Sequence, residues 1–134
     1  MIVLDEEIYD PDLAAQVAAW YAGQVISIKA LRPQTTIKDD AIPALLRSMP
    51  RPTFVTINVS DFWRRMPADP RYAVVCVDLP AWRVLEIPEW LRRLLRMSAF
   101  KSKSARMGKI IRMRPAQIEY YELSRRVQVL AWSE

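Results

Sequence analysis

The chain alternates between short apolar runs and longer segments in which apolar residues recur every three to four positions. Apolar runs rich in β-branched residues and bounded by prolines or polar residues are typical of strands buried on both faces of a parallel sheet. Four such runs lie at residues 2–4, 25–28, 53–57 and 72–77, and three further β-rich segments lie at 109–113, 118–121 and 127–132. We therefore predict an α/β fold with a central, mainly parallel sheet and C-terminal β-rich segments that cover a sheet edge or join another subunit.

The segment after the first run has the signals of a helix. Asp10 is a typical N-cap, and Pro11 suits the first helical position because it has no N–H to satisfy. One face of this helix carries Leu13, Val17 and Tyr21. Gly23 is expected to end it, so residues 2–28 predict a βαβ unit.

A second helix is predicted after a loop around Pro33. Pro43 fits best within the first helical turn, which makes Asp40 the natural N-cap and Asp39 the freer carboxylate. We expect this helix to run to about Met49.

A third helix is predicted from Pro88 onward. Its apolar stripe consists of Trp90, Leu91, Leu94 and Leu95. Trp90 is interpreted as a core residue rather than a platform for base stacking. The other face carries Arg92, Arg93 and Arg96, which must then point outward near a following loop at residues 101–106.

Polar residues follow directly on the apolar run at 53–57. In open parallel sheets, ligands bind outside the carboxyl ends of the strands, so Thr56, Asn58, Ser60 and Asp61 are candidates for the rim of a site. A purely structural interpretation is also open, in which Asn58 and Ser60 make the turn and Asp61 caps the next helix.

Composition excludes several kinds of chemistry. The chain has 134 residues, 51% of them hydrophobic, which predicts one domain over residues 1–134. It has no histidine, one cysteine and two glycines, so a histidine-based triad, a disulfide framework and a glycine-rich phosphate loop are ruled out. Any metal chemistry must use oxygen ligands, which suit Mg²⁺ or Mn²⁺.

The apolar runs also bear on location and on the cysteine. They are far shorter than the ~20 residues that cross a membrane, and no signal core is present, so we expect a cytoplasmic protein without membrane contact. Cys76 lies inside the run at 72–77 and is expected to be a buried, unreactive thiol. Asp78 follows the same run and is a further candidate acid.

Positive charge is concentrated in one block. Between Arg92 and Arg114 there are nine basic residues and no acid, while the whole chain carries +5, so the rest carries −4. A block this one-sided, beside acidic strand ends, predicts a track for a polyanion such as RNA that leads to a cation site. The residues proposed for RNA contact are Arg92, Arg93, Arg96, Lys101, Lys103 and Arg106.

The order of these motifs resembles the PIN-like nuclease superfamily in its short form, without the helical insertion. The resemblance rests on Leu4-Asp5-Glu6, on Asp39-Asp40-Ala41-Ile42 and on the segment from Thr56 to Phe62, and it covers roughly residues 2–77. It implies a three-layer sandwich around a parallel sheet and cleavage of RNA with Mg²⁺ or Mn²⁺ held by clustered carboxylates. Many bacterial members are toxins neutralised by an antitoxin.

Carried over residue by residue, the resemblance assigns Asp5, Asp39 and Asp61 as catalytic metal ligands. Glu6, Asp40, Thr56 and Asn58 would support them, although Asn58 stands where the family often has aspartate. The implied partners are RNA, a cognate antitoxin and a second copy in a homodimer. The alternatives are a decayed PIN-like module that binds RNA or a protein partner, and a purely structural subunit.

Overall fold

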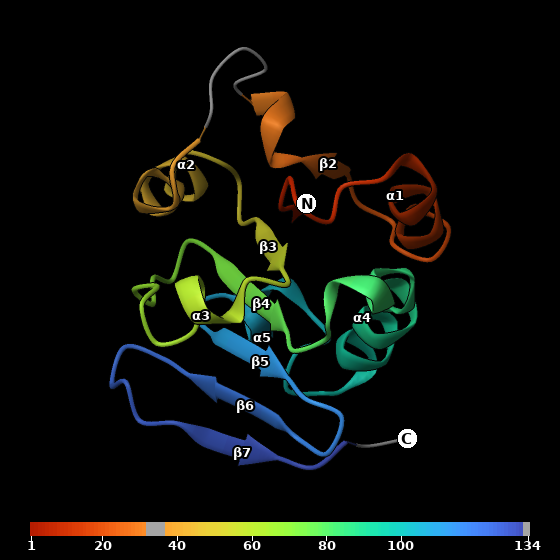
Figure 1. Ribbon diagram of the computed structural model, residues 1–134. Helices are drawn as coiled ribbons and strands as arrows, with labels where there is room; N and C mark the ends of the chain where they lie inside the picture. The colour runs from red at the N-terminus through yellow and green to blue at the C-terminus, as the bar shows by residue number, and fades with distance from the viewer. Residues whose placement is uncertain (32–36, 133–134) are drawn as a thin grey trace.

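The apolar runs form the strands of one mixed sheet. The computed structural model describes residues 1–31 and 37–132, so the loop expected around Pro33 lies outside the described residues. The strands are β1 (Ile2–Leu4), β2 (Val25–Ser27), β3 (Thr53–Thr56), β4 (Ala73–Val77), β5 (Ile110–Met113), β6 (Ile118–Tyr121) and β7 (Gln128–Leu130). They lie in the order β2-β1-β3-β4-β5-β6-β7 (Figure 1).

The sheet is parallel from β2 to β5 and antiparallel from β5 to β7. This confirms the α/β class and the mainly parallel sheet. The late β-rich segments extend the sheet beyond β4, and β7 forms one of its edges. The central strands β1, β3 and β4 are fully buried, as their uninterrupted apolar runs require.

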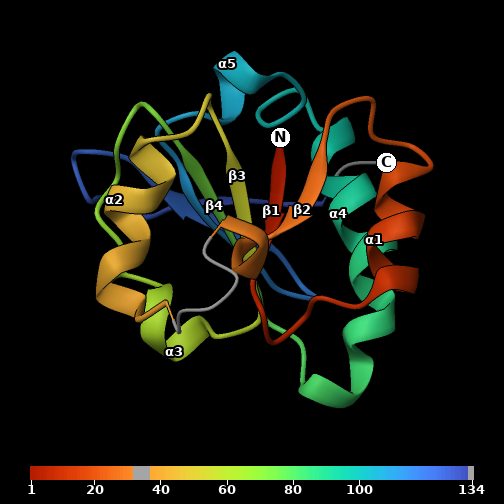
Figure 2. The same ribbon diagram turned by 90° about the horizontal axis from the view of Figure 1, so that it is seen from above.

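Helices cover both faces of the sheet. Helices α1 (Pro11–Ala18) and α4 (Ile87–Arg96) lie on one face, and α2 (Ile42–Arg47) and α3 (Val59–Phe62) lie on the other (Figure 2). Residues of β3 alternate between the two cores: Val55 packs on the α1 and α4 side, and Phe54 packs on the α2 and α3 side. The two layers of helices explain why strands with no polar face are stable here.

Helix α1 starts as predicted but ends earlier. The Asp10 side chain accepts hydrogen bonds from the N–H groups of Asp12 and Leu13, which confirms its capping role. The helix stops at Ala18, five residues before Gly23. Gly23 serves a different purpose, because a Cβ there would come within 2.7 Å of the Tyr21 ring.

Helix α4 confirms the predicted stripe, with Leu91, Leu94 and Leu95 buried. Trp90 is half-buried and packs edge-on against Trp132, with ring centroids 5.6 Å apart. The segment after α4 contains an additional short helix, α5 (Lys103–Arg106), where a loop was expected; the Ser102 side chain caps it by accepting from the Ala105 N–H.

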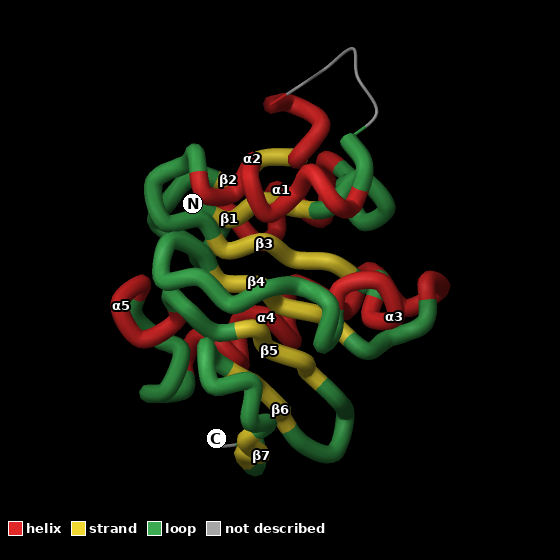
Figure 3. The backbone as a smooth tube through the Cα atoms, turned by 90° about the vertical axis from the view of Figure 1, so that its left-hand side faces the viewer, coloured by secondary structure: helices red, strands yellow, loops and turns green. Residues whose placement is uncertain are grey.

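The short helices α3 and α5 lie at opposite ends of the strands, which two perpendicular views show (Figures 2 and 3). Helix α3 follows the carboxyl end of β3, whereas α5 precedes the amino end of β5. None of the helices in the described ranges combines the length and apolarity needed to cross a bilayer.

Candidate functional site

Asp5 lies where β1 ends, in a nearly closed environment. Asp5 is only 7% exposed, and its Oδ2 accepts a hydrogen bond of 2.6 Å from the Thr56 hydroxyl. Its Oδ1 accepts from the Glu6 N–H at 2.8 Å. Burial raises the pKa of Asp5, and the hydrogen bonds from Thr56 and Glu6 oppose that shift. Glu6 itself is exposed and pairs with Lys29 at 3.6 Å.

Asn58 and Asp61 form the next part of the site. The Asn58 Oδ1 accepts from the Asp61 N–H at 3.3 Å, so Asn58 is the N-cap of α3. Its Nδ2 donates to the Asp61 Oδ2 at 2.7 Å. The predicted alternative in which Asp61 caps this helix is therefore wrong. Because the Asn58 oxygen faces the backbone and its amino group faces Asp61, Asn58 orients that carboxylate rather than offering an oxygen beside it.

Asp39 and Asp40 lie in a 3₁₀ turn, Asp39–Ala41, directly before α2. The prediction that Asp40 caps α2 is wrong: the cap position is Ala41, with no side-chain hydrogen bond, and α2 starts at Ile42. Pro43 occupies the second helical position, where its missing N–H costs nothing. Both carboxylates are consequently left free and exposed.

The three predicted acids lie within range of one another's charge. Burial raises the pKa of Asp39 most, and the carboxylates of Asp61, Asp5 and Asp40 raise it further. Like charges raise each other's pKa only when they are near neighbours. Asp5 directly follows β1, Asp39 lies in the 3₁₀ turn and Asp61 lies in α3, so all three lie at the carboxyl ends of the parallel strands.

A cavity of about 300 Å³ adjoins this cluster. Asp39, Asp40 and Asp61 line it, while Asp5 does not. Arg65 also lines it. Sequence reasoning did not select Arg65, because a basic pair after α3 carries no signal of its own; only the fold brings this residue to the same cavity as the acids.

The donor set fits a hard divalent cation in chemistry but not fully in placement. All candidate donors are oxygens, which Mg²⁺ and Mn²⁺ prefer. Among residues 1–31 and 37–132, however, no three His, Cys, Asp or Glu side chains are placed to hold one ion as they stand. Asp39 and Asp61 share the cavity and Asp5 does not line it, so these side chains would have to approach one another to complete a three-acid site.

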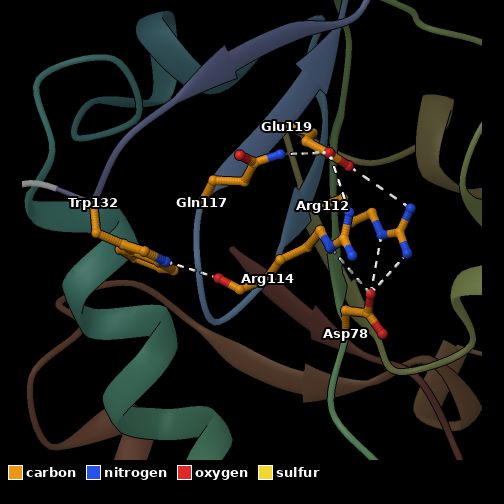
Figure 4. Close-up of polar contacts among 6 residues, drawn as sticks. All are labelled: Asp78, Arg112, Arg114, Gln117, Glu119 and Trp132. Atoms are coloured by element: carbon orange, nitrogen blue, oxygen red, sulfur yellow. Dashed lines mark hydrogen bonds and ion pairs between the residues drawn. The ribbon is translucent and has the colours of Figure 1, made fainter.

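Asp78 does not join the acidic cluster. It accepts from Arg112 at 2.7 Å, and Arg112 and Arg114 both reach Glu119 on β6 (Figure 4). The network ties the end of β4 to the β5–β6 turn, where the Trp132 indole donates to the Arg114 carbonyl. Arg112 and Arg114 are therefore neutralised, so the nine basic residues are not uniformly uncompensated.

The residues predicted to contact RNA do not form one track beside the acids. Arg92, Arg96, Lys101, Lys103 and Arg106 line a second cavity of about 620 Å³. Arg93 instead lies over the Trp132 ring, 4.6 Å from its centroid. Arg106 is 2% exposed, and its Nε donates to the Thr53 hydroxyl at 3.2 Å, so it belongs to the wall of this cavity and not to an open surface track.

The basic cavity and the acidic cluster lie at opposite ends of the strands. Thr53 begins β3 and contacts Arg106, whereas Thr56 ends β3 and contacts Asp5. The expectation of a basic track leading into the acids is therefore wrong. Its physical reason is the crossover: α4 leaves the carboxyl edge after β4 and must return to the amino edge before parallel β5 can begin.

Comparisons with known protein families, with curated proteins and with solved structures find no match for this chain. The site therefore has to be judged by its own contacts. Those contacts pair Asp5 with Thr56 and Asp61 with Asn58, and Asp39 lines the same cavity as Asp61.

Proposed function

We propose that this protein is a PIN-like, metal-dependent ribonuclease whose site is the acidic cluster at the carboxyl edge of the sheet. One observation carries the proposal: Asp39, Asp40 and Asp61, from two separate segments, line one cavity, and buried Asp5 lies at the same ends of the strands, held by Thr56. A protein keeps like charges together at a cost to stability, and a bound cation is the usual reason.

Asp5, Asp39 and Asp61 would hold Mg²⁺ or Mn²⁺, with Glu6 and Asp40 in the outer shell. When bound, such an ion lowers the pKa of a water and stabilises negative charge on a phosphodiester. Thr56 holds the Asp5 carboxylate by a hydrogen bond of 2.6 Å, and Asn58 holds the Asp61 carboxylate by one of 2.7 Å. Arg65, on the wall of the same cavity, is placed to contact an RNA phosphate.

A second candidate function is a non-catalytic module that binds a protein partner such as an antitoxin. It is favoured by an exposed apolar pair after β4, in which Trp82 is 82% and Leu85 is 66% exposed. Large apolar side chains exposed near each other are typical of interaction surfaces. Under this alternative, Asn58 in place of aspartate marks a site that has lost its chemistry.

The test is RNA cleavage by the purified chain with Mn²⁺, with Mg²⁺ and with EDTA, on single-stranded and structured RNA. Asp39→Asn and Asp61→Asn are each expected to lower the rate by more than about 100-fold, above the loss typical of outer-shell residues. Asp12→Asn is the matched control, because Asp12 lies on α1, away from the cluster, and undergoes the same change of charge.

Ion binding provides a readout that does not depend on turnover. Mn²⁺ should raise the melting temperature of the wild-type chain and of Asp12→Asn, but not that of Asp39→Asn. Intact RNA under all conditions, together with equal melting temperatures with and without Mn²⁺, would reject the enzyme. An RNA or protein complex that forms without cleavage would then support the second candidate.

A further inference from the structure

The second cavity combines five cations with an aromatic wall. It measures about 620 Å³ and lies between the turn after α1 and the segment from α4 to α5. Its cationic lining consists of Arg92, Arg96, Lys101, Lys103 and Arg106. No acidic side chain of the described residues lines it, so its charge is not neutralised from within.

Arg106 is the key residue of this cavity. Its three guanidinium hydrogen bonds go to neutral oxygens: the Thr53 hydroxyl at 3.2 Å, the Phe100 carbonyl at 2.9 Å and the Lys101 carbonyl at 3.0 Å. Within the described part of the chain, no carboxylate forms an ion pair with it. A buried cation without a counter-charge is unfavourable unless a ligand supplies one.

The helix ends nearby do not account for this charge. The carboxyl ends of α1 and α4 both point toward this edge of the sheet, and each contributes a partial charge of about −0.5. Together they offset roughly one of the five cations. The remaining excess favours an anion of high charge density.

The aromatic wall narrows the class of anion. Trp20 lines the cavity beside Tyr21, with ring centroids 6.3 Å apart in an edge-to-face arrangement. The Tyr21 ring is held against the backbone at Gly23, where no Cβ intervenes. A preformed aromatic surface next to clustered cations suits a base attached to phosphate, since arginine forks bind phosphate and aromatic rings stack on bases.

We propose that this cavity binds the terminal phosphate of a nucleotide, with the attached base against Trp20. The ligand is either a free nucleotide or the 5′-phosphorylated end of an RNA, which share this chemistry. Its volume lies within the ~300–1,000 Å³ range of small-molecule sites, whereas an acidic peptide would need an extended groove. The proposal goes beyond RNA cleavage and does not depend on it, because the cavity lies at the opposite edge of the sheet from the acids.

The experiment is calorimetric titration of the full chain with phosphate, AMP, ATP and a polyglutamate peptide at fixed ionic strength. ATP is expected to bind more tightly than AMP, and AMP more tightly than inorganic phosphate. Lys103→Glu should weaken ATP binding roughly tenfold or more, the scale of one lost charge-assisted contact. Arg126→Glu is the matched control, because it changes the charge equally at an exposed residue outside the cavity and should leave affinity within about twofold.

Two further variants separate folding from binding. Arg106→Lys keeps the charge but removes the fork, and its effect counts only if its circular dichroism and melting match the wild type. Trp20→Leu should remove the advantage of AMP over phosphate while leaving phosphate binding unchanged. Lys103→Glu stands on its own if Arg106→Lys fails to fold, because Lys103 is exposed.

The source of the nucleotide is decided by a 5′-phosphorylated oligonucleotide and its 5′-hydroxyl counterpart. A preference for the phosphorylated end supports the RNA source, and tight binding of ATP alone supports the free nucleotide. The proposal is overturned if both oligonucleotides and ATP bind equally, if polyglutamate matches ATP, or if Lys103→Glu and Arg126→Glu behave alike.

Discussion

Thr56 and Asp5 are joined by a hydrogen bond of 2.6 Å between the Thr56 hydroxyl and the Asp5 carboxylate, and both residues are buried. The parallel register pairs Leu4 with Val55. Asp5 follows Leu4 and Thr56 follows Val55, so the register places these two residues side by side. The same Thr56 oxygen accepts from the Asn58 N–H at 3.0 Å. One hydroxyl thus links the end of β1 to the start of α3 and favours the ionised form of Asp5.

Thr56→Val should lower the free energy of unfolding at neutral pH by about 1–3 kcal/mol, because it leaves a buried carboxylate without its donor. Urea denaturation at pH 7 measures this loss. Thr56→Ser keeps the hydroxyl and should lose much less. Equal losses in the two variants would show that packing of the methyl group matters and the hydrogen bond does not.

Asp39 has a raised pKa in the folded protein, so its ionisation opposes folding. The penalty is absent below the pKa of the unfolded chain, about 3.9, and is fully present above the folded pKa. Asp39→Asn should therefore stabilise the protein at pH 7 by up to about 0.5 kcal/mol, the scale of like-charge relief near a surface.

That gain should shrink as the pH falls toward 3.5 and vanish there, as unfolding curves at several pH values would record. Asp12→Asn is the control: it removes an acid from the first turn of α1 and is expected to give a small loss at pH 7. A gain for Asp39→Asn that persists unchanged at low pH would contradict the charge explanation.

Cys76 should be inert in the native state. It is buried in β4, and burial raises the pKa of its thiol to about 12. A thiol-specific reagent at pH 8 should modify it only through unfolding, so the rate should rise steeply with urea. Rapid stoichiometric modification of the folded chain would show that β4 is accessible.

Arg112→Met should destabilise the β4–β5–β6 region. It removes the partner of Asp78 at 2.7 Å and one partner of Glu119, which is 13% exposed. For this partly buried pair we expect a loss of about 1–2 kcal/mol, between the values typical of exposed and buried pairs. Arg126→Met is the control and should be near neutral. The loss should lessen at 1 M salt; a salt-independent loss would point to the packing of Arg112 against Trp63 instead.

The secondary structure could largely be predicted from local physics. A strand buried on both faces needs an uninterrupted apolar run, so the segment at Thr53–Thr56 could be recognised without its neighbours. The apolar stripe of α4 could be predicted from the helical spacing of its apolar residues. The caps were harder: Asp10 caps α1 as predicted, but Asp40 does not cap α2, because a 3₁₀ turn precedes that helix.

The strand-end rule predicted a site beside Thr56, Asn58 and Asp61, whereas the grouping of Asp5, Asp39 and Asp61 was what the resemblance to PIN-like nucleases implied. What the sequence could not determine was which edge each later segment returns to, or which charges are already paired. Arg112 found Asp78 and Glu119 through strand register, and Arg106 was buried beside Thr53 because α4 crosses back over the sheet. The sequence therefore determined the charges and the strands. Only tertiary packing separated the basic cavity from the acidic cluster, because α4 carries the chain from the carboxyl ends of the strands back to their amino ends before the basic residues after α4 are reached.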